Sequence, residues 1–119
     1  LKPQYLTDSF ERWQSSNSLY CFPVLEFESN VLRSLKLTET GEVSSMFSQH
    51  ELTRTQDLPQ AYFDAGQFYW GSREAWLSED KIHNHALGYV LPKYSVVDID
   101  DDNDWRFAER LYQAQLALA

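Results

Sequence analysis

Three segments of the chain carry apolar residues at helical spacing. Residues 7–15 place Phe10 and Trp13 on one face, and Thr7 or Asp8 is suited to cap this helix. A second, shorter helix is expected to begin after Ser72 and to end near residue 77. From residue 103 onward the helical pattern returns, with a stripe formed by Trp105, Ala108, Leu111 and Tyr112.

Strand-like runs lie between these helices. Residues 19–27 are rich in strand formers and predict a buried strand, although Pro23 favours a sheet edge or a bulge. Leu35 and Leu37 precede a turn-forming stretch at residues 39–42, which predicts a hairpin whose second strand lies within residues 43–47. Further strands are expected at residues 67–70, 86–91 and 95–100. Strands mixed with helices indicate the α/β or the α+β class.

Length and charge exclude several kinds of protein. The 119 residues correspond to one domain or part of one, and 18 acidic against 10 basic residues give a net charge of −8. Nucleic-acid binding is not expected, since no basic stripe is present to neutralise phosphates. No run is apolar enough to span a membrane, and we expect no membrane partner. Cys21 is the single cysteine and is interpreted as a core thiol; with no leader-like segment at the start, we expect a cytoplasmic protein.

The acidic run at residues 97–104 is the strongest local signal for chemistry. On a strand Asp98 and Asp100 would point the same way, and two carboxylates that converge favour a divalent cation such as Mg²⁺ or Mn²⁺. A cation held there would suit phosphoryl transfer. Two other interpretations stay open: a solvated acidic loop that caps the following helix, and a calcium loop of the EF-hand kind, in which Asn103 would replace the required glycine.

A second candidate site lies within residues 54–70. Gly66 suits a close approach of the backbone to a ligand, and Gln67 and Tyr69 would share one strand face with their polar ends exposed. Arg54 is suited to bind a carboxylate. The alternative interpretation is a loop that leads into an ordinary core strand. The histidines at positions 83 and 85 lack an evident third ligand and are interpreted as parts of a structural loop.

Both candidate sites resemble motifs of one enzyme family. The segment RTQDLPQAYFDAGQFYW at residues 54–70, followed by VDID at 97–100 and a helix containing Asp104 and Trp105, resembles the acylneuraminate cytidylyltransferases. It is most like their pseudaminic acid branch, in which DAGQFY replaces a motif centred on Asn-Gly. The resemblance covers essentially all of residues 1–119 but only the C-terminal half of the family's length.

This resemblance implies a fold, a reaction and site residues. The fold would be the C-terminal part of a Rossmann-like nucleotide-diphospho-sugar transferase, and the reaction would join CMP from CTP to a nonulosonic acid with release of pyrophosphate. Asp98 and Asp100 match the family's catalytic, metal-binding aspartates, and Tyr69 matches a sugar-contacting tyrosine. Arg54 resembles an arginine near the sugar. Ala65 replaces a sugar-contacting asparagine, which leaves the neighbouring Asp64 and Gln67 as candidates to bind the sugar.

The resemblance also implies how the chain is organised. Family members are dimers, and residues 19–47 correspond to a dimerisation arm, whereas residues 54–115 correspond to the sugar- and metal-binding part. The loop that binds the CTP phosphates is not among residues 1–119, so we expect the chain alone to be inactive. Two alternatives remain at this stage: a synthetase for neuraminic, legionaminic or deoxyoctulosonic acid, and a non-catalytic acidic oligomerisation domain.

Overall fold

The chain divides into two compact units. The computed structural model describes residues 1–118. The first unit contains Leu1–Leu25 and the chain from Asp64 onward, and the second is Glu26–Phe63. Among the described residues, no helix has the length and apolar character that crossing a membrane requires.

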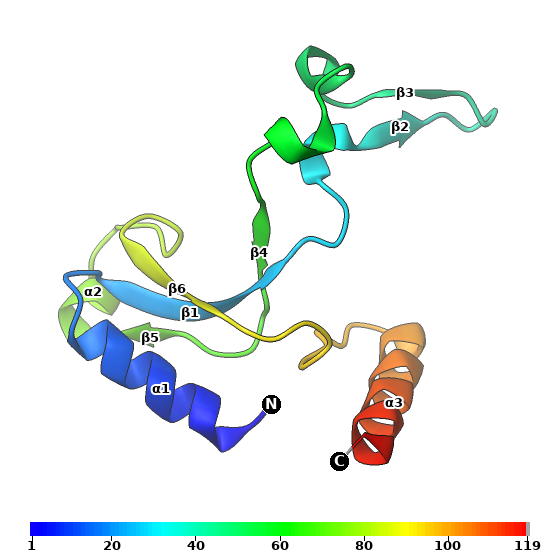
Figure 1. Ribbon diagram of the computed structural model, residues 1–119. Coiled ribbons are helices and arrows are strands. Elements are labelled where there is room, and N and C mark those ends of the chain that lie inside the picture. Colours follow the sequence, from blue (N-terminus) through cyan, green and yellow to red (C-terminus); the bar gives the residue numbers. More distant parts are fainter. Residues whose placement is uncertain (119) are drawn as a thin grey trace. The chain divides into compact units, whose positions relative to one another are not determined.

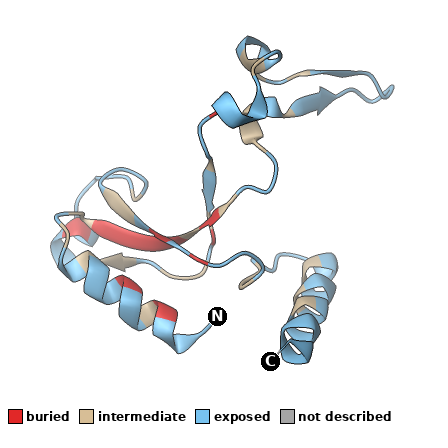
Figure 2. Ribbon diagram, in the orientation of Figure 1, coloured by how far each residue is buried: buried red, intermediate tan, exposed pale blue. Residues whose placement is uncertain are grey.

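The centre of the first unit is strand β1 (Tyr20–Glu26). It pairs in antiparallel fashion with β5 (Trp70–Gly71) and in parallel with β6 (Ala86–Val90), and β4 (Tyr62–Asp64) completes a four-stranded sheet (Figure 1). β1 is also the most continuous buried segment (Figure 2). The predicted strands at residues 19–27 and 86–91 are therefore confirmed.

Pro23 lies within this central strand, so the expectation of an edge or a bulge was wrong. The pairing of β1 with β5 covers only Tyr20 and Cys21 and ends before Pro23. The carbonyl of Pro23 accepts a hydrogen bond from the Ala65 N–H at 3.0 Å. The N–H that proline lacks would face this same side of the strand, beyond the end of the β5 ladder, so its absence breaks no pairing there.

Helix α1 (Pro3–Gln14) begins earlier than the sequence pattern predicted. Pro3 occupies the first helical position, where its missing N–H has no intrahelical partner to lose. Neither Thr7 nor Asp8 is a cap. The predicted aromatic face is confirmed, because the ring centroids of Phe10 and Trp13 lie 5.9 Å apart.

The core of the first unit is small and mixes aliphatic with aromatic side chains. Cys21 is fully buried, as predicted, and burial raises the pKa of its thiol. The other buried members of this core are Tyr5, Leu25, Ala65, Tyr89 and Leu91.

Helix α2 follows its predicted cap, and helix α3 begins close to its expected start. Ser72 Oγ accepts a hydrogen bond from the Ala75 N–H at 3.1 Å and caps α2 (Arg73–Leu77). Helix α3 (Asp102–Ala117) begins with Asp101 as its cap, close to the expected start. None of its described residues is buried, so the apolar stripe predicted there is largely exposed within this chain.

Two predicted strands differ in the structure. The strand expected at residues 67–70 reduces to β5, because Gly66 adopts a positive φ of 66° and turns the chain immediately before it. Residues 95–100 form no strand. Pro92, which has no N–H to donate, follows the last ladder bond from Leu91, and Tyr94 has a φ of 63° that turns the backbone again.

The second unit contains the predicted hairpin. Strands β2 (Leu35–Leu37) and β3 (Val43–Ser45) pair in antiparallel fashion, and Gly41 has the positive φ of 88° that a tight turn requires. Leu35 and Leu37 are exposed. The single-turn 3₁₀ helices of this unit are η1 (Val31–Arg33), η2 (Ser48–His50) and η3 (Thr55–Asp57).

The mixed α/β organisation predicted from the sequence is thus confirmed. The Rossmann-like fold and the dimerisation arm remain predictions, and so does the assignment of residues 1–119 to part of a single domain.

Candidate functional site

A polar cluster surrounds the carboxylate of Asp64 in the first unit. The Tyr69 hydroxyl donates to it, at 3.0 Å from Oδ1 and 2.9 Å from Oδ2. The Gly66 N–H donates to Oδ1 at 2.9 Å, which closes a turn typical of aspartate two residues before a glycine. His83 Nε2 lies 3.2 Å from Oδ2. We call Asp64, Tyr69, Gly66 and His83 the Asp64 cluster.

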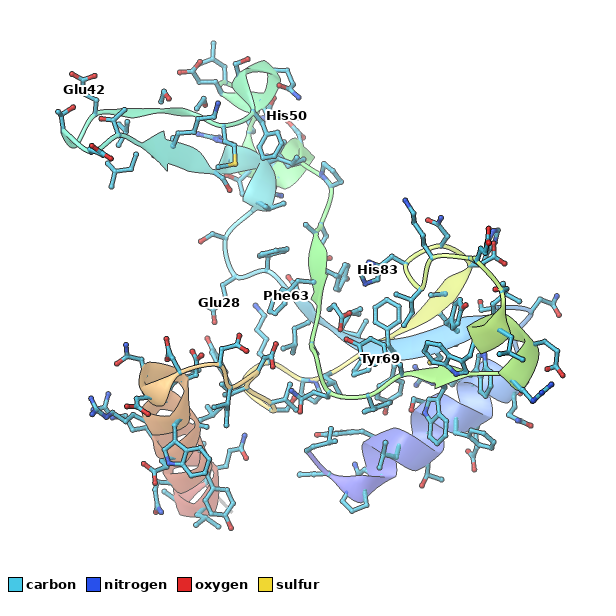
Figure 3. The ribbon with its side chains drawn as sticks, turned by 180° about the vertical axis from the view of Figure 1, so that it is seen from behind. Glu28, Glu42, His50, Phe63, Tyr69 and His83 are labelled. Atoms are coloured by element: carbon cyan, nitrogen blue, oxygen red, sulfur yellow. The ribbon has the colours of Figure 1, made fainter. Side chains whose placement is uncertain are left out.

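Aromatic rings flank the Asp64 cluster. The ring of Phe22, on β1, lies 5.6 Å from that of Tyr69 and 5.3 Å from that of His83, measured between centroids. The side chains of Tyr69 and His83 lie on the same part of the first unit (Figure 3). Rings with polar tips beside a carboxylate suit a ligand with both C–H faces and hydroxyl groups, such as a sugar.

Asp98 lies beside this cluster. A β-carbon at residue 66 would be only 2.8 Å from Asp98 Oδ2, so only a glycine lets the carboxylate come this close. Gln67 ties the two segments together, because its Nε2 donates to the carbonyls of Ala65 at 3.0 Å and Val97 at 3.3 Å. The expected close approach at Gly66 is therefore to the chain's own Asp98.

The pKa of Tyr69 is raised by burial and by two nearby carboxylates. Burial raises the pKa of Tyr69 above its ordinary value, and the hydrogen bond to Asp64 together with the negative charges of Asp64 and Asp98 raises it further. Tyr69 is therefore a hydrogen-bond donor at neutral pH. The prediction that Gln67 and Tyr69 share one strand face was wrong, because residues 67–69 form no strand. Both side chains nevertheless lie near Asp98.

Much of the acidic run caps helix α3. Asp101 Oδ1 accepts from the Asp104 N–H at 2.9 Å, and Asp104 Oδ2 accepts from the N–H groups of Asp101 at 3.2 Å and Asp100 at 3.0 Å. This reciprocal pair is a capping box. The interpretation of the run as a helix cap is thus confirmed for Asp101 and Asp104. The side chains of Asp98 and Asp100 take no part in this cap.

The shared strand face predicted for Asp98 and Asp100 does not exist, because residues 95–100 form no strand. Within residues 1–118 the structure contains no group of three or more His, Cys, Asp or Glu side chains arranged to hold a metal ion. Magnesium is commonly bound by one or two carboxylates together with substrate phosphates. Asp98 and Asp100 offer two exposed carboxylates, which are the type of protein ligand in that donor set, and the metal site there stays a prediction.

Arg54 belongs to the second unit. Its Nε donates to Asp57 Oδ2 at 2.8 Å, and both side chains are largely exposed. The predicted contact of Arg54 with a sugar carboxylate stays a prediction.

Ala65 is a core residue in this structure. It is 2% exposed and packs with the buried side chains that include Cys21 and Tyr89. Its small size is therefore explained by packing, independently of any sugar.

His83 was not among the site residues predicted from the sequence. Its only signal was the i, i+2 spacing with His85, which was interpreted as part of a structural loop. The pairing of Asp64 with His83 spans 19 positions of the chain, so no local pattern could indicate it.

Comparison with known proteins identifies relatives of this chain. No protein-family model matches it. Pseudaminic acid cytidylyltransferase of Campylobacter jejuni is 39% identical over 114 residues, which cover 95% of this chain and 49% of that protein. The chain thus spans about half the length of this relative.

More distant relatives carry related names. A Helicobacter pylori protein named pseudaminic acid cytidylyltransferase and UDP-2,4-diacetamido-2,4,6-trideoxy-beta-L-altropyranose hydrolase is 31% identical over 95% of this chain and 22% of its own length. N-acylneuraminate cytidylyltransferase B of Danio rerio is 26% identical over 92% of this chain and 26% of its own length. The resemblance inferred from the sequence motifs is confirmed, and it concerns part of each relative.

Proposed function

We propose that this chain forms the sugar- and metal-binding part of a cytidylyltransferase that activates a nonulosonic acid of the pseudaminic acid type. The observation that carries the proposal is the position of Asp98 against Gly66, which joins the two motifs that resemble those of the cytidylyltransferases into one site. Asp64, Gln67 and Tyr69 lie at the same place.

The reaction requires a nucleophile, a leaving group and a base. The anomeric hydroxyl of the sugar attacks the α-phosphorus of CTP, a new P–O bond forms, and the bond to the bridging oxygen breaks to release pyrophosphate. The hydroxyl proton passes to a base, for which Asp98 and Asp100 are the candidate carboxylates in this chain.

Binding and orientation of the sugar belong to Asp64, Gln67 and Tyr69. The Tyr69 hydroxyl donates to Asp64 and is fixed by it, so the ring and hydroxyl present one defined geometry to the ligand. Arg54, in the second unit, keeps its predicted role as a carboxylate-binding residue. Its exposed ion pair with Asp57 is worth at most about 1 kcal/mol, so a carboxylate ligand can replace Asp57.

Asp98 and Asp100 would hold Mg²⁺ or Mn²⁺. When bound, the ion offsets the negative charge of the phosphates during transfer. The carboxylates lie outside the helix cap and are exposed, so they are accessible to a nucleotide-bound ion.

The proposal extends to substrate, assembly and location. A neuraminic acid substrate is the alternative favoured by the similarity to N-acylneuraminate cytidylyltransferase B, although that identity is 26% against 39% for the pseudaminic acid enzyme. A homodimer is proposed through the part of residues 19–47 that follows the buried strand β1, where the hairpin exposes Leu35 and Leu37. The location proposed is the cytoplasm, where CTP is available.

The test is CMP transfer by the full-length protein that carries this chain. With CTP and Mg²⁺, pseudaminic acid should be converted with a higher kcat/KM than N-acetylneuraminic acid. Asp98→Asn and Asp100→Asn should each lower kcat by about 100-fold or more, since each removes one charge from the reacting centre. The matched control is Asp102→Asn, which changes one charge in the first turn of α3 and should leave kcat within a few-fold. Equal effects of all three variants would contradict the site, and absence of transfer to either sugar would contradict the function.

A further inference from the structure

His83 is the member of the Asp64 cluster to which the proposed function gives no role. It lies in the loop between α2 and β6, and its side chain is 65% exposed, against 26% for Asp64. Its ring packs at a tilt of 58° against that of Phe22, and its Nε2 lies 3.2 Å from Asp64 Oδ2. The ring is therefore held at two points while most of its surface remains open.

The partners of Asp64 determine which nitrogen of His83 carries the proton. Tyr69 and Gly66 both donate to the Asp64 carboxylate, and an ionised carboxylate only accepts hydrogen bonds. His83 must therefore donate through Nε2–H to Asp64. In the neutral imidazole the other nitrogen, Nδ1, then carries a free lone pair and is an acceptor.

The open Nδ1 can accept a hydrogen bond from a ligand in place of water. Within the Asp64 cluster Tyr69 and Gly66 direct their own donors to Asp64, so neither supplies one. A nonulosonic acid carries several hydroxyl and amide N–H groups, and each can donate to a fixed nitrogen acceptor. The ring of Phe22 is buried, so it supports the ring of His83 from the interior and leaves the exposed side of that ring to a ligand.

We propose that His83 is a sugar-contacting specificity residue whose Nδ1 accepts a hydrogen bond from a hydroxyl or amide N–H group of the nonulosonic acid. This inference rests on the proposed function, because it takes the sugar as the ligand of the same site. Asp64 is then a positioning residue, which fixes the orientation of His83 and of Tyr69 at once. If the bound sugar shields this acceptor from water, it discriminates between sugars more strongly than an apolar contact, since loss of the matching donor then leaves the acceptor unpaired.

Two amide substitutions test the roles of the two His83 nitrogens one at a time. The longer side-chain amide introduced by His83→Gln reaches the place of Nε2 and can keep the bond to Asp64, but it loses the acceptor at Nδ1. His83→Asn has the opposite effect, because its shorter amide can provide an acceptor near Nδ1 but does not reach Asp64. His83→Phe keeps only the ring contact with Phe22. His85→Asn is the matched control, since His85 lies in the same loop with a φ of 56°, a conformation that asparagine tolerates.

The measurement is the affinity of the full-length protein for pseudaminic acid, by calorimetry without CTP, and KM for the same sugar at saturating CTP and Mg²⁺. His83→Gln and His83→Phe should weaken binding and raise KM by about 3- to 10-fold, the usual worth of one neutral hydrogen bond. His83→Asn should lose less, and His85→Asn should match the wild type.

Each outcome has a distinct meaning. Wild-type affinity and KM in His83→Gln would overturn the inference while leaving the proposed function standing. A larger loss in His83→Asn than in His83→Gln would also overturn it, because His83 would then act only through Asp64. Sugar binding by the wild type without CMP transfer would contradict the proposed function alone, and the effect of His83→Gln on affinity would still decide the inference. A wild type that binds no nonulosonic acid would overturn both.

Discussion

Replacing Gly66 with alanine would test whether the position of Asp98 matters for catalysis. Residue 66 has a φ of 66°, a conformation that is costly for any residue with a β-carbon. The added β-carbon would also lie 2.8 Å from Asp98 Oδ2 and 3.0 Å from its Cγ. The substitution therefore combines backbone strain with displacement of one named side chain.

The two effects differ in size and in what they change. Backbone strain should lower the free energy of unfolding by about 1–2 kcal/mol. The collision adds little to this loss, because Asp98 is exposed and its carboxylate can move away by several tenths of an ångström. Catalysis is far more sensitive to such a movement, and misplacement of a reacting group by about 1 Å can lower the rate about 100-fold. Gly66→Ala should therefore cause a modest loss of stability and a large loss of turnover.

Gly41→Ala is the control for the strain. Its φ is 88° and a β-carbon there would meet nothing within 4 Å, so urea denaturation should show a stability loss similar to that of Gly66→Ala. Turnover of the full-length protein should be measured for Gly66→Ala alone and in an Asp98→Ala background. If displacement of Asp98 is the cause, Gly66→Ala should have almost no further effect once Asp98 is absent. The same fold loss in both backgrounds would refute the reasoning.

Three further predictions follow from burial, charge and exposed apolar surface. Ala65→Asn should lower the free energy of unfolding by about 1–3 kcal/mol, since Ala65 is 2% exposed and an amide there lacks a partner; an unchanged urea midpoint would contradict this packing role. Because the pKa of Tyr69 is raised from its ordinary value of 10.0, its contribution to stability is complete below about pH 10 and is lost as pH rises through the folded pKa. Tyr69→Phe should therefore flatten the fall of the urea midpoint above pH 10, and an equally steep fall would argue against the shift. Leu35→Glu should weaken self-association measured by sedimentation, whereas Ser44→Glu, which adds one charge on the opposite strand face, should weaken it less; equal effects would place the interface elsewhere.

Elements defined by a local pattern could be predicted from the sequence. The strand formers of β1, the turn at Gly41 and the cap at Ser72 each reside in a few consecutive residues, and the structure has them where they were expected. The start of α1 was missed because the apolar face begins after the helix does. Its actual signal was Pro3 at the first helical position.

Elements that depend on a distant partner could not be predicted in the same way. Residues 95–100 alternate like a strand but have no strand neighbour, because the β6 ladder ends at Leu91 and the chain turns at Tyr94. Pro23 has no N–H to donate to a neighbouring strand, but it lies beyond the end of the β1–β5 pairing, where no strand partner needs that donor. In both cases the deciding fact is which segment lies alongside, and a single sequence does not contain it.

The same distinction explains what could be predicted of the site. Asp98 was a candidate site residue because it lies in an acidic run. That run contains both the cap of α3 and the candidate site residue Asp98. Asp101 and Asp104 satisfy the N-terminus of α3, a local task that the sequence spacing already suggested.

Asp98 differs from them through its contact with Gly66, which lies 32 positions earlier in the chain and belongs to the other motif. His83 enters the site through a similarly distant contact with Asp64. Because His83 has no motif of its own, only the geometry of its two nitrogens connects it with the sugar. The pair of amide substitutions at this position therefore examines the part of the site that depends most on the fold and least on the resemblance to known enzymes.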